Sequence, residues 1–437
     1  MKLFYARELD AYPRAARRAW LLAMAVLATL VASYEASISP VLPLLLKDLK
    51  MSLTTYGLIA AASVVAGAAS AYWGGRYADR WGRVTLLIPV LLLTGVVDFA
   101  MVLVHNPGEL LIARCVLSFI EGAGAATTAG LVRDFSPRVG RSTAFGFWTW
   151  GPVGANYLAA AIAGLTLPIF VVWQSQFIII GTISVVLSLV IAFNIADLAP
   201  ALRARVIHTA SEGEELTAEP HEHVEIGRTR ALLSHPHIWA HLLGISSWLV
   251  LYETLVLYGP TMLVQSFHLT VATAANVMSA FWVLNLGSLI IAGIVSDRLK
   301  LRKPVSLVGA IFSTITIIVL VSQFGATTSG VEVAIIGAIL GAFLGVTYAP
   351  WMAGYSENTE DIRASLQGTA WGLYGLFVRV MVIGLAVIAP IVVAATAGWR
   401  TWMIVAIVFE ALYIPAIFAF QGPWRRAAVE QRLATPA

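Results

Sequence analysis

The feature that most constrains this chain is a succession of apolar blocks, each about 20 residues long or longer, which is the length a helix needs to cross a bilayer. Twelve blocks follow one another in two groups of six. Backbone N–H and C=O groups in lipid must be hydrogen-bonded within the protein, and long blocks without alternation satisfy them as helices and not as barrel strands. The sequence therefore predicts an all-α membrane protein. Its transmembrane helices are expected near residues 19–46, 55–75, 84–104, 110–132, 142–165, 173–195, 238–264, 271–296, 304–323, 330–353, 367–394 and 401–420.

The composition agrees with this prediction and excludes a soluble globular enzyme. Of the 437 residues, 59% are hydrophobic and only 12% are charged, whereas soluble proteins carry about 25% charged residues. The net charge is +4, but the basic residues lie between the apolar blocks. We therefore expect a lipid bilayer as the partner and no nucleic acid. The single cysteine, Cys115, lies inside a block, so no intrachain disulfide can form.

The distribution of basic residues predicts the orientation of the chain. If the N-terminus is cytoplasmic, 23 of the 28 Lys and Arg residues fall in cytoplasmic segments, and only Lys47, Lys50 and Arg400 fall outside. Lys and Arg concentrate in the cytoplasmic loops of membrane proteins. We therefore expect a multi-pass protein of the cell membrane (inner or plasma membrane), with both termini in the cytoplasm.

A hydrophilic stretch divides the chain into two halves. Residues 196–237 are rich in Glu, Thr, His and Ala and lack apolar periodicity, as expected of a mobile cytoplasmic linker. The predicted domains are a six-helix bundle at 1–195, a linker at 196–237, and a second six-helix bundle with a cytoplasmic tail at 238–437. The linker contains His221-Glu222-His223, a combination that can bind a metal ion. We interpret these residues as solvated and unliganded, and we expect no metal site.

A charged motif occurs at equivalent places in the two halves. An aspartate-arginine pair follows the second apolar block at Asp79 and the eighth block at Asp297, 218 residues later. The loops after the fourth and tenth blocks also correspond, with an offset near 222. These offsets indicate that the halves are copies of one six-helix unit.

The motif suits a short connection between two helices that pack closely and slide. Gly75 permits a close backbone approach, and Asp79 can accept hydrogen bonds from a helix N-terminus. The alternative is a generic basic loop, which two matched occurrences make less attractive. We predict that the motif residues gate a conformational change. They are Gly75, Asp79, Arg80, Gly82, Arg83, Asp297 and Arg298.

With this loop signature the sequence resembles the major facilitator superfamily, from the first predicted span to the twelfth. The resemblance implies two pseudo-symmetric six-helix bundles that rock around a site at the membrane midplane, so that the site opens to each side in turn. It also implies a small-molecule substrate, and we expect the protein to function as a monomer.

Other classes of protein lack their signatures here. No Gly-x-x-x-x-Gly-Lys-Ser/Thr loop occurs, so direct ATP drive is not expected. No apolar block carries a His-Glu-x-x-His motif or an Asp pair on adjacent turns, and we find no filter sequence of a channel. We therefore expect neither enzymatic activity nor a cofactor.

Ionisable residues inside the predicted spans are candidates for function, because each costs several kcal/mol in hydrocarbon unless it is paired or hydrated. Glu35 and Glu253 are 218 residues apart, the offset of the repeated loop, and each follows a tyrosine, Tyr34 or Tyr252, that could donate a hydrogen bond. We predict proton-coupling acids with substrate-binding tyrosines. The alternative is a pair of structural acids, each satisfied by a neighbouring helix. Asp98 and Glu410 also fall within spans, but their helices are usually peripheral.

Arg114 and Glu121 are seven residues apart and therefore lie on one face of the fourth span. This segment resembles the fourth helix of organic-anion and organophosphate proton symporters, except that Ala125-Ala126-Thr127-Thr128 replaces a proline-rich continuation. By that resemblance Arg114 binds or orients the substrate and Glu121 carries a proton.

Arg379 stands in the middle of the eleventh span among aromatic residues that include Trp371 and Tyr374. Arginine stays charged at any accessible pH, so it needs a carboxylate partner or an anionic ligand. We predict that all three residues bind substrate. Pairing of Arg379 with a glutamate of another helix is the alternative.

The sequence therefore predicts a proton-coupled symporter that imports a small organic anion of the carboxylate type. One feature favours a different class, proton-driven efflux of lipophilic compounds. Gly146, Gly151-Pro152 and Gly154 resemble the glycine-proline signature of drug antiporters, although Ala155-Asn156 replaces the expected glycine pair. Aromatic residues could wall a pocket for either kind of substrate. They are Trp148, Trp150, Tyr157, Trp248, Tyr258, Trp282, Trp351, Trp371 and Tyr374.

Overall fold

The computed structural model describes residues 7–33, 38–136, 141–200, 202–203, 225–363 and 366–425. The chain divides into two compact units, Met1–His221 and Glu222–Ala437. The boundary falls inside the predicted linker. The motif His221-Glu222-His223 lies outside the described residues.

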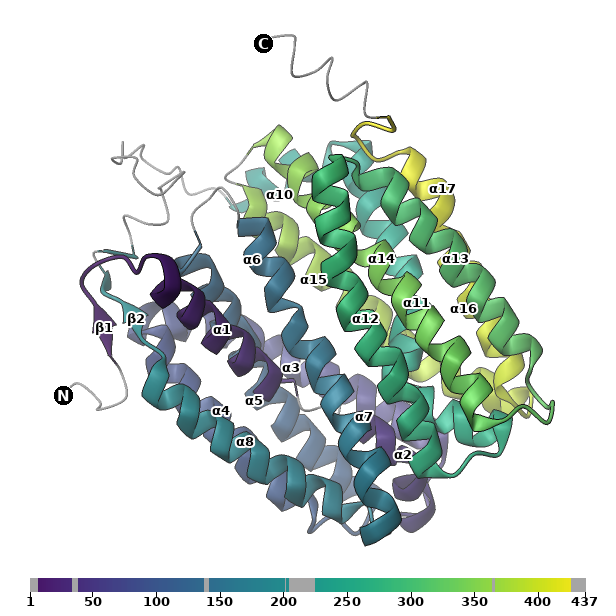
Figure 1. Ribbon diagram of the computed structural model, residues 1–437. Coiled ribbons are helices and arrows are strands. Elements are labelled where there is room, and N and C mark those ends of the chain that lie inside the picture. The colour runs from purple at the N-terminus through teal and green to yellow at the C-terminus, as the bar shows by residue number, and fades with distance from the viewer. Residues whose placement is uncertain are drawn as a thin grey trace. The chain divides into compact units, whose positions relative to one another are not determined.

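The described part of the first unit is built almost entirely of helices (Figure 1). Its elements are β1 (Glu8–Leu9), α1 (Ala15–Val31), α2 (Ile38–Asp48), α3 (Leu53–Trp81), α4 (Arg83–Met101), α5 (Pro107–Asp134), α6 (Arg141–Trp148), α7 (Trp150–Phe170), α8 (Gln174–Asn194) and β2 (Asp197–Leu198).

The described part of the second unit is entirely helical (Figure 1). Its elements are α10 (Glu225–Leu233), α11 (Pro236–Phe267), α12 (Val271–Leu299), α13 (Arg302–Ser322), α14 (Gly330–Ile362), α15 (Gln367–Ala395), α16 (Trp399–Ala411) and α17 (Tyr413–Phe418).

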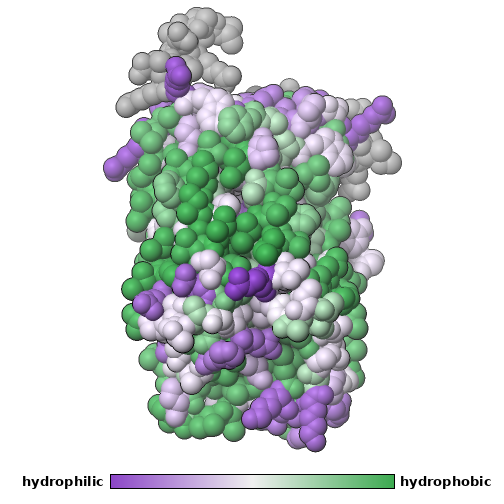
Figure 2. Space-filling model, turned by 90° about the vertical axis from the view of Figure 1, so that its right-hand side faces the viewer, coloured by the Kyte–Doolittle hydropathy of each residue, from purple (hydrophilic) through white to green (hydrophobic). Residues whose placement is uncertain are grey.

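Eleven helical segments within the described residues are long and apolar enough to cross a membrane. The first predicted span, 19–46, corresponds to α1 and α2, which flank residues 34–37 outside the described part. Large apolar side chains remain exposed on many helices, as expected where lipid is the solvent. Figure 2 shows hydrophobic residues over a broad area of one face, with hydrophilic residues along its upper rim and in its lower part. The prediction of a helical membrane protein is confirmed.

Polar residues in the loops start several of these helices. The side chain of Ser52 accepts a hydrogen bond from the backbone N–H of Thr55 at the start of α3. Helix α14 begins with a capping box, in which Ser329 and Glu332 satisfy each other's backbone N–H groups. Such caps supply partners for amides that the helix itself leaves free.

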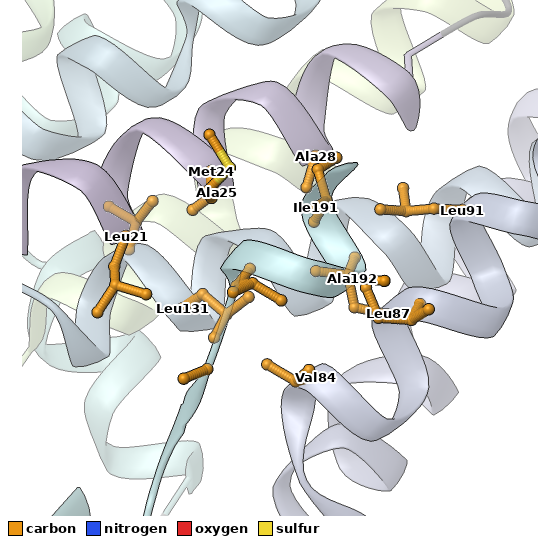
Figure 3. Close-up of a cluster of buried hydrophobic side chains, with 14 of the residues drawn as sticks. Leu21, Met24, Ala25, Ala28, Val84, Leu87, Leu91, Leu131, Ile191 and Ala192 are labelled. Atoms are coloured by element: carbon orange, nitrogen blue, oxygen red, sulfur yellow. The ribbon is translucent and has the colours of Figure 1, made fainter. Parts of the chain in front are cut away.

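The first unit has an apolar core in which α1, α4, α5 and α8 meet (Figure 3). Leu21 and Ala28 of α1 point toward Leu87 of α4, and Leu131 of α5 and Ile191 of α8 complete the cluster. Helices α4 and α8 are also covered with apolar residues on their outer faces. The core therefore depends on complementary packing, because lipid is as apolar as these side chains.

Glycines set the closest helix contacts in both units. A Cβ atom added at Gly122 of α5 would lie 2.2 Å from the carbonyl oxygen of Gly67 in α3. In the second unit a Cβ atom at Gly341 of α14 would lie 2.2 Å from the carbonyl oxygen of Phe281 in α12. Gly122 and Gly341 are 219 residues apart. The small residues of the fourth span therefore bring two helices together, as the sequence predicted, and the second half repeats the contact.

Two short strands modify the all-helical picture. Strand β1 pairs in parallel with β2, and the amide of Asp197 donates to the carbonyl of Arg7 at 2.7 Å. This pairing joins the N-terminal segment to the residues that follow α8. Helix α10 lies near the other end of the stretch predicted as a linker. The structure thus adds regular elements at both ends of that stretch, where the sequence shows no apolar periodicity.

Replacement of Gly341 by alanine is expected to destabilise the second unit by about 1–3 kcal/mol, because the new methyl group overlaps the backbone of Phe281. Gly287 of α12 provides a matched control, since a Cβ atom there meets nothing within 4 Å. Alanine favours helix over glycine by about 1 kcal/mol, so Gly287→Ala should be neutral or stabilising. Thermal unfolding of the two purified variants tests this. Equal melting temperatures would contradict the close contact.

Candidate functional site

Several predicted site residues are brought together in the second unit, and two lie outside the described residues. Tyr34 and Glu35 fall in the undescribed segment 34–37, so their pairing stays a prediction. Tyr252 and Glu253 lie side by side on α11, and both are half-buried. Trp371 and Tyr374 lie on α15, where they are also half-buried.

An aromatic cluster connects four helices of the second unit. Trp351 of α14 stands at its centre, with its ring centroid 5.3 Å from Tyr374 of α15 and 5.6 Å from Tyr348 of α14. Trp248 of α11 stacks on Tyr348 at 5.8 Å. The aromatic cluster consists of Trp248, Tyr252, Trp282, Tyr348, Trp351, Tyr355, Trp371 and Tyr374.

Hydrogen bonds fix the polar ends of the cluster. The hydroxyls of Tyr348 and Tyr374 lie 2.6 Å apart and share a hydrogen bond. The hydroxyl of Tyr252 donates to Oδ1 of Asn285 at 3.4 Å, and Nδ2 of Asn285 donates to the carbonyl of Gly341 at 2.9 Å. The glycine contact between α12 and α14 therefore also holds the amide that orients Tyr252.

The carboxyl group of Glu253 belongs to the same region. It lies close enough to interact electrostatically with the hydroxyls of Tyr252, Tyr348 and Tyr374. A tyrosine hydroxyl can donate to a carboxylate or accept from a carboxylic acid. The cluster therefore surrounds an acid with groups that suit either of its protonation states.

Two hydrogen-bond donors in the cluster are unused. The indole N–H groups of Trp248 and Trp351 are buried and meet no acceptor in the described part of the chain. A buried polar group without a partner costs about 1–3 kcal/mol. Unused donors beside Glu253 indicate a region that is completed by water or by a bound ligand.

Arg379 extends this region along α15. Its guanidinium Nη1 lies 3.8 Å from the position that a Cβ atom would take on Gly375, one turn earlier. The side chain therefore runs back toward the turn that carries Trp371 and Tyr374. Arg379 is half-buried in a membrane-spanning helix and forms no hydrogen bond or ion pair with any other described residue.

The predicted pair on α5 is buried inside the first unit. Arg114 is 2% exposed and Glu121 is 6% exposed. The guanidinium of Arg114 donates to the hydroxyls of Tyr56 at 2.9 Å and Ser63 at 3.3 Å on α3, and it lies over the Tyr56 ring. Arg114 is therefore held in one orientation by a neighbouring helix.

The predicted gating residue Arg83 begins α4 as a buried ion-pair partner. Its guanidinium lies 2.7 Å from Asp134 at the end of α5, and both side chains are 1% exposed. It also donates to the carbonyl of Gly130. Arg203 reaches the same carboxylate at 3.2 Å and also pairs with Asp197.

Asp197 caps the N-terminus of α4, accepting hydrogen bonds from the amides of Arg83 at 2.6 Å and Val84 at 3.3 Å. Gly82 precedes this turn with φ +98°, a conformation that glycine adopts without strain. The sequence analysis suggested such a capping role for Asp79, whose side chain lies outside the described part. Asp197 was missed, although it is the first acid after the sixth apolar block.

The second unit repeats the arrangement in an exposed form. Arg302 begins α13, lies 2.7 Å from Glu357 near the end of α14, and also pairs with Asp297. Arg83 and Arg302 are 219 residues apart, and Asp134 and Glu357 are 223 residues apart. The predicted motif residues Gly75, Arg80 and Arg298 are half-buried or exposed, with none of these ion-pair contacts.

Comparison with known proteins identifies the family. The sequence model described as the Major Facilitator Superfamily matches residues 21–385. This chain belongs to the Major Facilitator Superfamily. The protein is therefore a multi-pass membrane transporter, and the predicted family and fold class are confirmed.

Solved structures with the same fold include a bacterial homologue of the human lysosomal transporter Spinster. In its inward-facing, unoccupied conformation it matches with a TM-score of 0.67 and 16% identity, covering 93% of this chain and 98% of that chain. Its occupied conformation matches with a TM-score of 0.66 and 15% identity. At this identity the likeness concerns the fold alone.

Two curated relatives differ in what they carry. Quinolone resistance protein NorA of Staphylococcus aureus is 31% identical over 108 residues, which is 25% of this chain and 28% of NorA. A hexuronate transporter of Bacillus subtilis is 24% identical over 285 residues, which is 65% of each protein. The chain thus matches about a quarter of NorA and about two thirds of the hexuronate transporter.

Loss of the buried ion pair in this facilitator is expected to cost far more stability than loss of the exposed one. Asp134→Ala leaves Arg83 buried without its carboxylate, and breaking such a pair costs about 3–5 kcal/mol. The control is Asp297→Ala, because the side chain of Asp297 is 58% exposed and an exposed pair contributes about 0–1 kcal/mol. Unfolding by denaturant in mixed micelles measures both. Equal losses would show that Asp134 does not anchor α4 to α5.

Proposed function

We propose that this protein imports a small organic anion of the carboxylate type together with protons. The observation that carries the proposal is Arg379, a half-buried arginine in a membrane span with no partner among the described residues. An unpaired guanidinium in hydrocarbon costs at least about 2.5 kcal/mol. A bound carboxylate satisfies it with two parallel hydrogen bonds.

The aromatic cluster supplies the rest of the proposed substrate site. The unused indole donors of Trp248 and Trp351 can donate to hydroxyl or carboxylate oxygens of a ligand. The rings of Trp371 and Tyr374 provide apolar faces on the helix that also carries Arg379. A few polar groups within a mostly aromatic wall are typical of sites for small molecules.

Protons provide the proposed driving force. Glu121 is a buried acid on a span, and Glu253 lies among three tyrosines. A carboxyl group in such surroundings exchanges a proton more readily than it remains charged without a partner. Arg114, on the same face of α5 as Glu121, is held by Tyr56 and Ser63 and supplies a fixed positive charge. Glu35 stays a predicted member of this set.

The proposed cycle combines these groups. Protonation of Glu121 or Glu35 from outside precedes docking of the anion on Arg379, with Arg114 assisting. The bundles then change orientation, and release follows when the acid loses its proton to the cytoplasm. The likeness to a hexuronate transporter supports an anionic sugar acid as a representative substrate. The likeness to NorA covers too little of either chain to favour drug efflux.

Arg379→Gln is expected to reduce uptake of the transported carboxylate at least about tenfold, because a lost charge-assisted contact exceeds 1.4 kcal/mol. Arg379→Lys should retain part of the uptake, since it keeps the charge but not the paired geometry. Proteoliposomes with an imposed pH gradient and a labelled panel of mono- and dicarboxylates, hexuronates included, provide the measurement.

Arg230 of α10 is the matched control, because it is exposed and outside the membrane spans. Arg230→Gln should transport at the normal rate. Carboxylate uptake that survives Arg379→Gln overturns the proposed anion site. Dye efflux that survives Arg379→Gln but is lost in Glu35→Gln supports proton-driven efflux instead.

Glu121→Gln is expected to abolish uptake driven by a pH gradient while preserving exchange of labelled for unlabelled substrate. The amide keeps the shape of the side chain but cannot release a proton. Glu109 begins the same helix and its side chain is 48% exposed, so Glu109→Gln serves as the control. Gradient-driven uptake at the normal rate in Glu121→Gln would remove this acid from the coupling mechanism.

A further inference from the structure

A cavity of about 440 Å³ lies where the N-terminal segment of the first unit meets the ends of α1 and α8. It is lined by residues 7–10, by Arg17, Trp20 and Leu21 of α1, and by residues 194–196. Pairing of β1 with β2 holds its outer wall, since the amide of Ala199 donates to the carbonyl of Leu9 at 3.0 Å. None of the proposed transport residues lines it.

The charges in the cavity are of both signs. Arg7 and Arg17 contribute positive charge, and Glu8 and Asp10 contribute negative charge. Arg7 donates one bond to the carbonyl of Ala192 at 3.1 Å and is otherwise exposed. The side chains of Arg17 and Asp10 form no hydrogen bond or ion pair with any described residue. The cavity can therefore hold a cationic and an anionic group of one ligand together.

The cavity also lies at a membrane boundary. Helix α8 is a candidate membrane span that ends at Asn194, a lining residue. Trp20, which lines the cavity, is 51% exposed, and Phe193 in the last turn of α8 is 63% exposed. Exposed Trp side chains are typical of the interface between headgroups and hydrocarbon. A ligand in this position can place polar groups in the cavity and apolar chains along α8.

We propose that this cavity binds the headgroup of a zwitterionic phospholipid that carries a primary ammonium group. The phosphate lies on the guanidinium groups of Arg7 and Arg17, which favour phosphate oxygens. The ammonium group donates hydrogen bonds to the carboxylates of Glu8 and Asp10. A purely anionic headgroup would face these two acids without a cation, and a free phosphate would leave the apolar border of the cavity unused.

The test measures lipid binding to the purified, delipidated full chain by native mass spectrometry. The probes are phosphatidylethanolamine, phosphatidylcholine, which lacks N–H donors, and phosphatidylglycerol, which lacks the cation. We expect the first to bind about tenfold more tightly than either of the others. Asp10→Asn should remove most of the preference over phosphatidylcholine. Arg17→Gln should weaken all three lipids, because each carries a phosphate.

Arg14→Gln is the matched control, because Arg14 is exposed in the same segment but does not line the cavity. It should bind lipid as the unmodified protein does. A photoreactive phosphatidylethanolamine should label peptides from residues 7–21 or 189–196, and millimolar inorganic phosphate should not reduce that labelling. Equal binding of the three lipids, equal effects of Arg14→Gln and Arg17→Gln, or displacement by phosphate would each overturn the proposal.

Discussion

The structure depends on one constraint, which is that a polar group in hydrocarbon must find a partner within the protein. Hydroxyl groups in the spans meet it locally, as Thr127 does by donating to the carbonyl of Ala123 at 2.7 Å. Buried acids meet it across helices, since Ser184 of α8 donates to Asp98 of α4 and Ser313 of α13 donates to Glu410 of α16. Within the described part, departures from this constraint therefore indicate function.

The two units meet the same constraint with related devices. Each begins the helix after its charged loop with an arginine that pairs with an acid near the end of the next helix. Each also uses a glycine, Gly122 or Gly341, to bring two helices into backbone contact. The ion pair is buried in the first unit and exposed in the second, because Arg203 and Asp197 cover Arg83 while nothing comparable in the described residues covers Arg302. Duplication thus preserved the geometry and changed the strength.

The sequence predicts the helices well because hydrophobic length is a local property, and the spans containing Arg114, Glu253 and Arg379 are helical as expected. It predicts partners poorly because they depend on which helix faces meet. Asp134, Asp197 and Glu357 lie far along the chain from the arginines they bind. Tyr348 was also missed, although it lies three residues before Trp351 and shares a hydrogen bond with Tyr374. Only the 219- and 223-residue offsets could have revealed the ion pairs in advance.

Arg114 and Arg379 show how one constraint assigns different roles. Both are arginines in membrane spans, but Arg114 is satisfied by Tyr56 and Ser63, whereas Arg379 forms no hydrogen bond or ion pair in the described part of the chain. A guanidinium with protein partners is preorganised and suits a fixed charge beside a proton-carrying acid. A guanidinium without them gains most from an incoming anion. The first unit is therefore suited to proton exchange, and the second to recognition of the substrate.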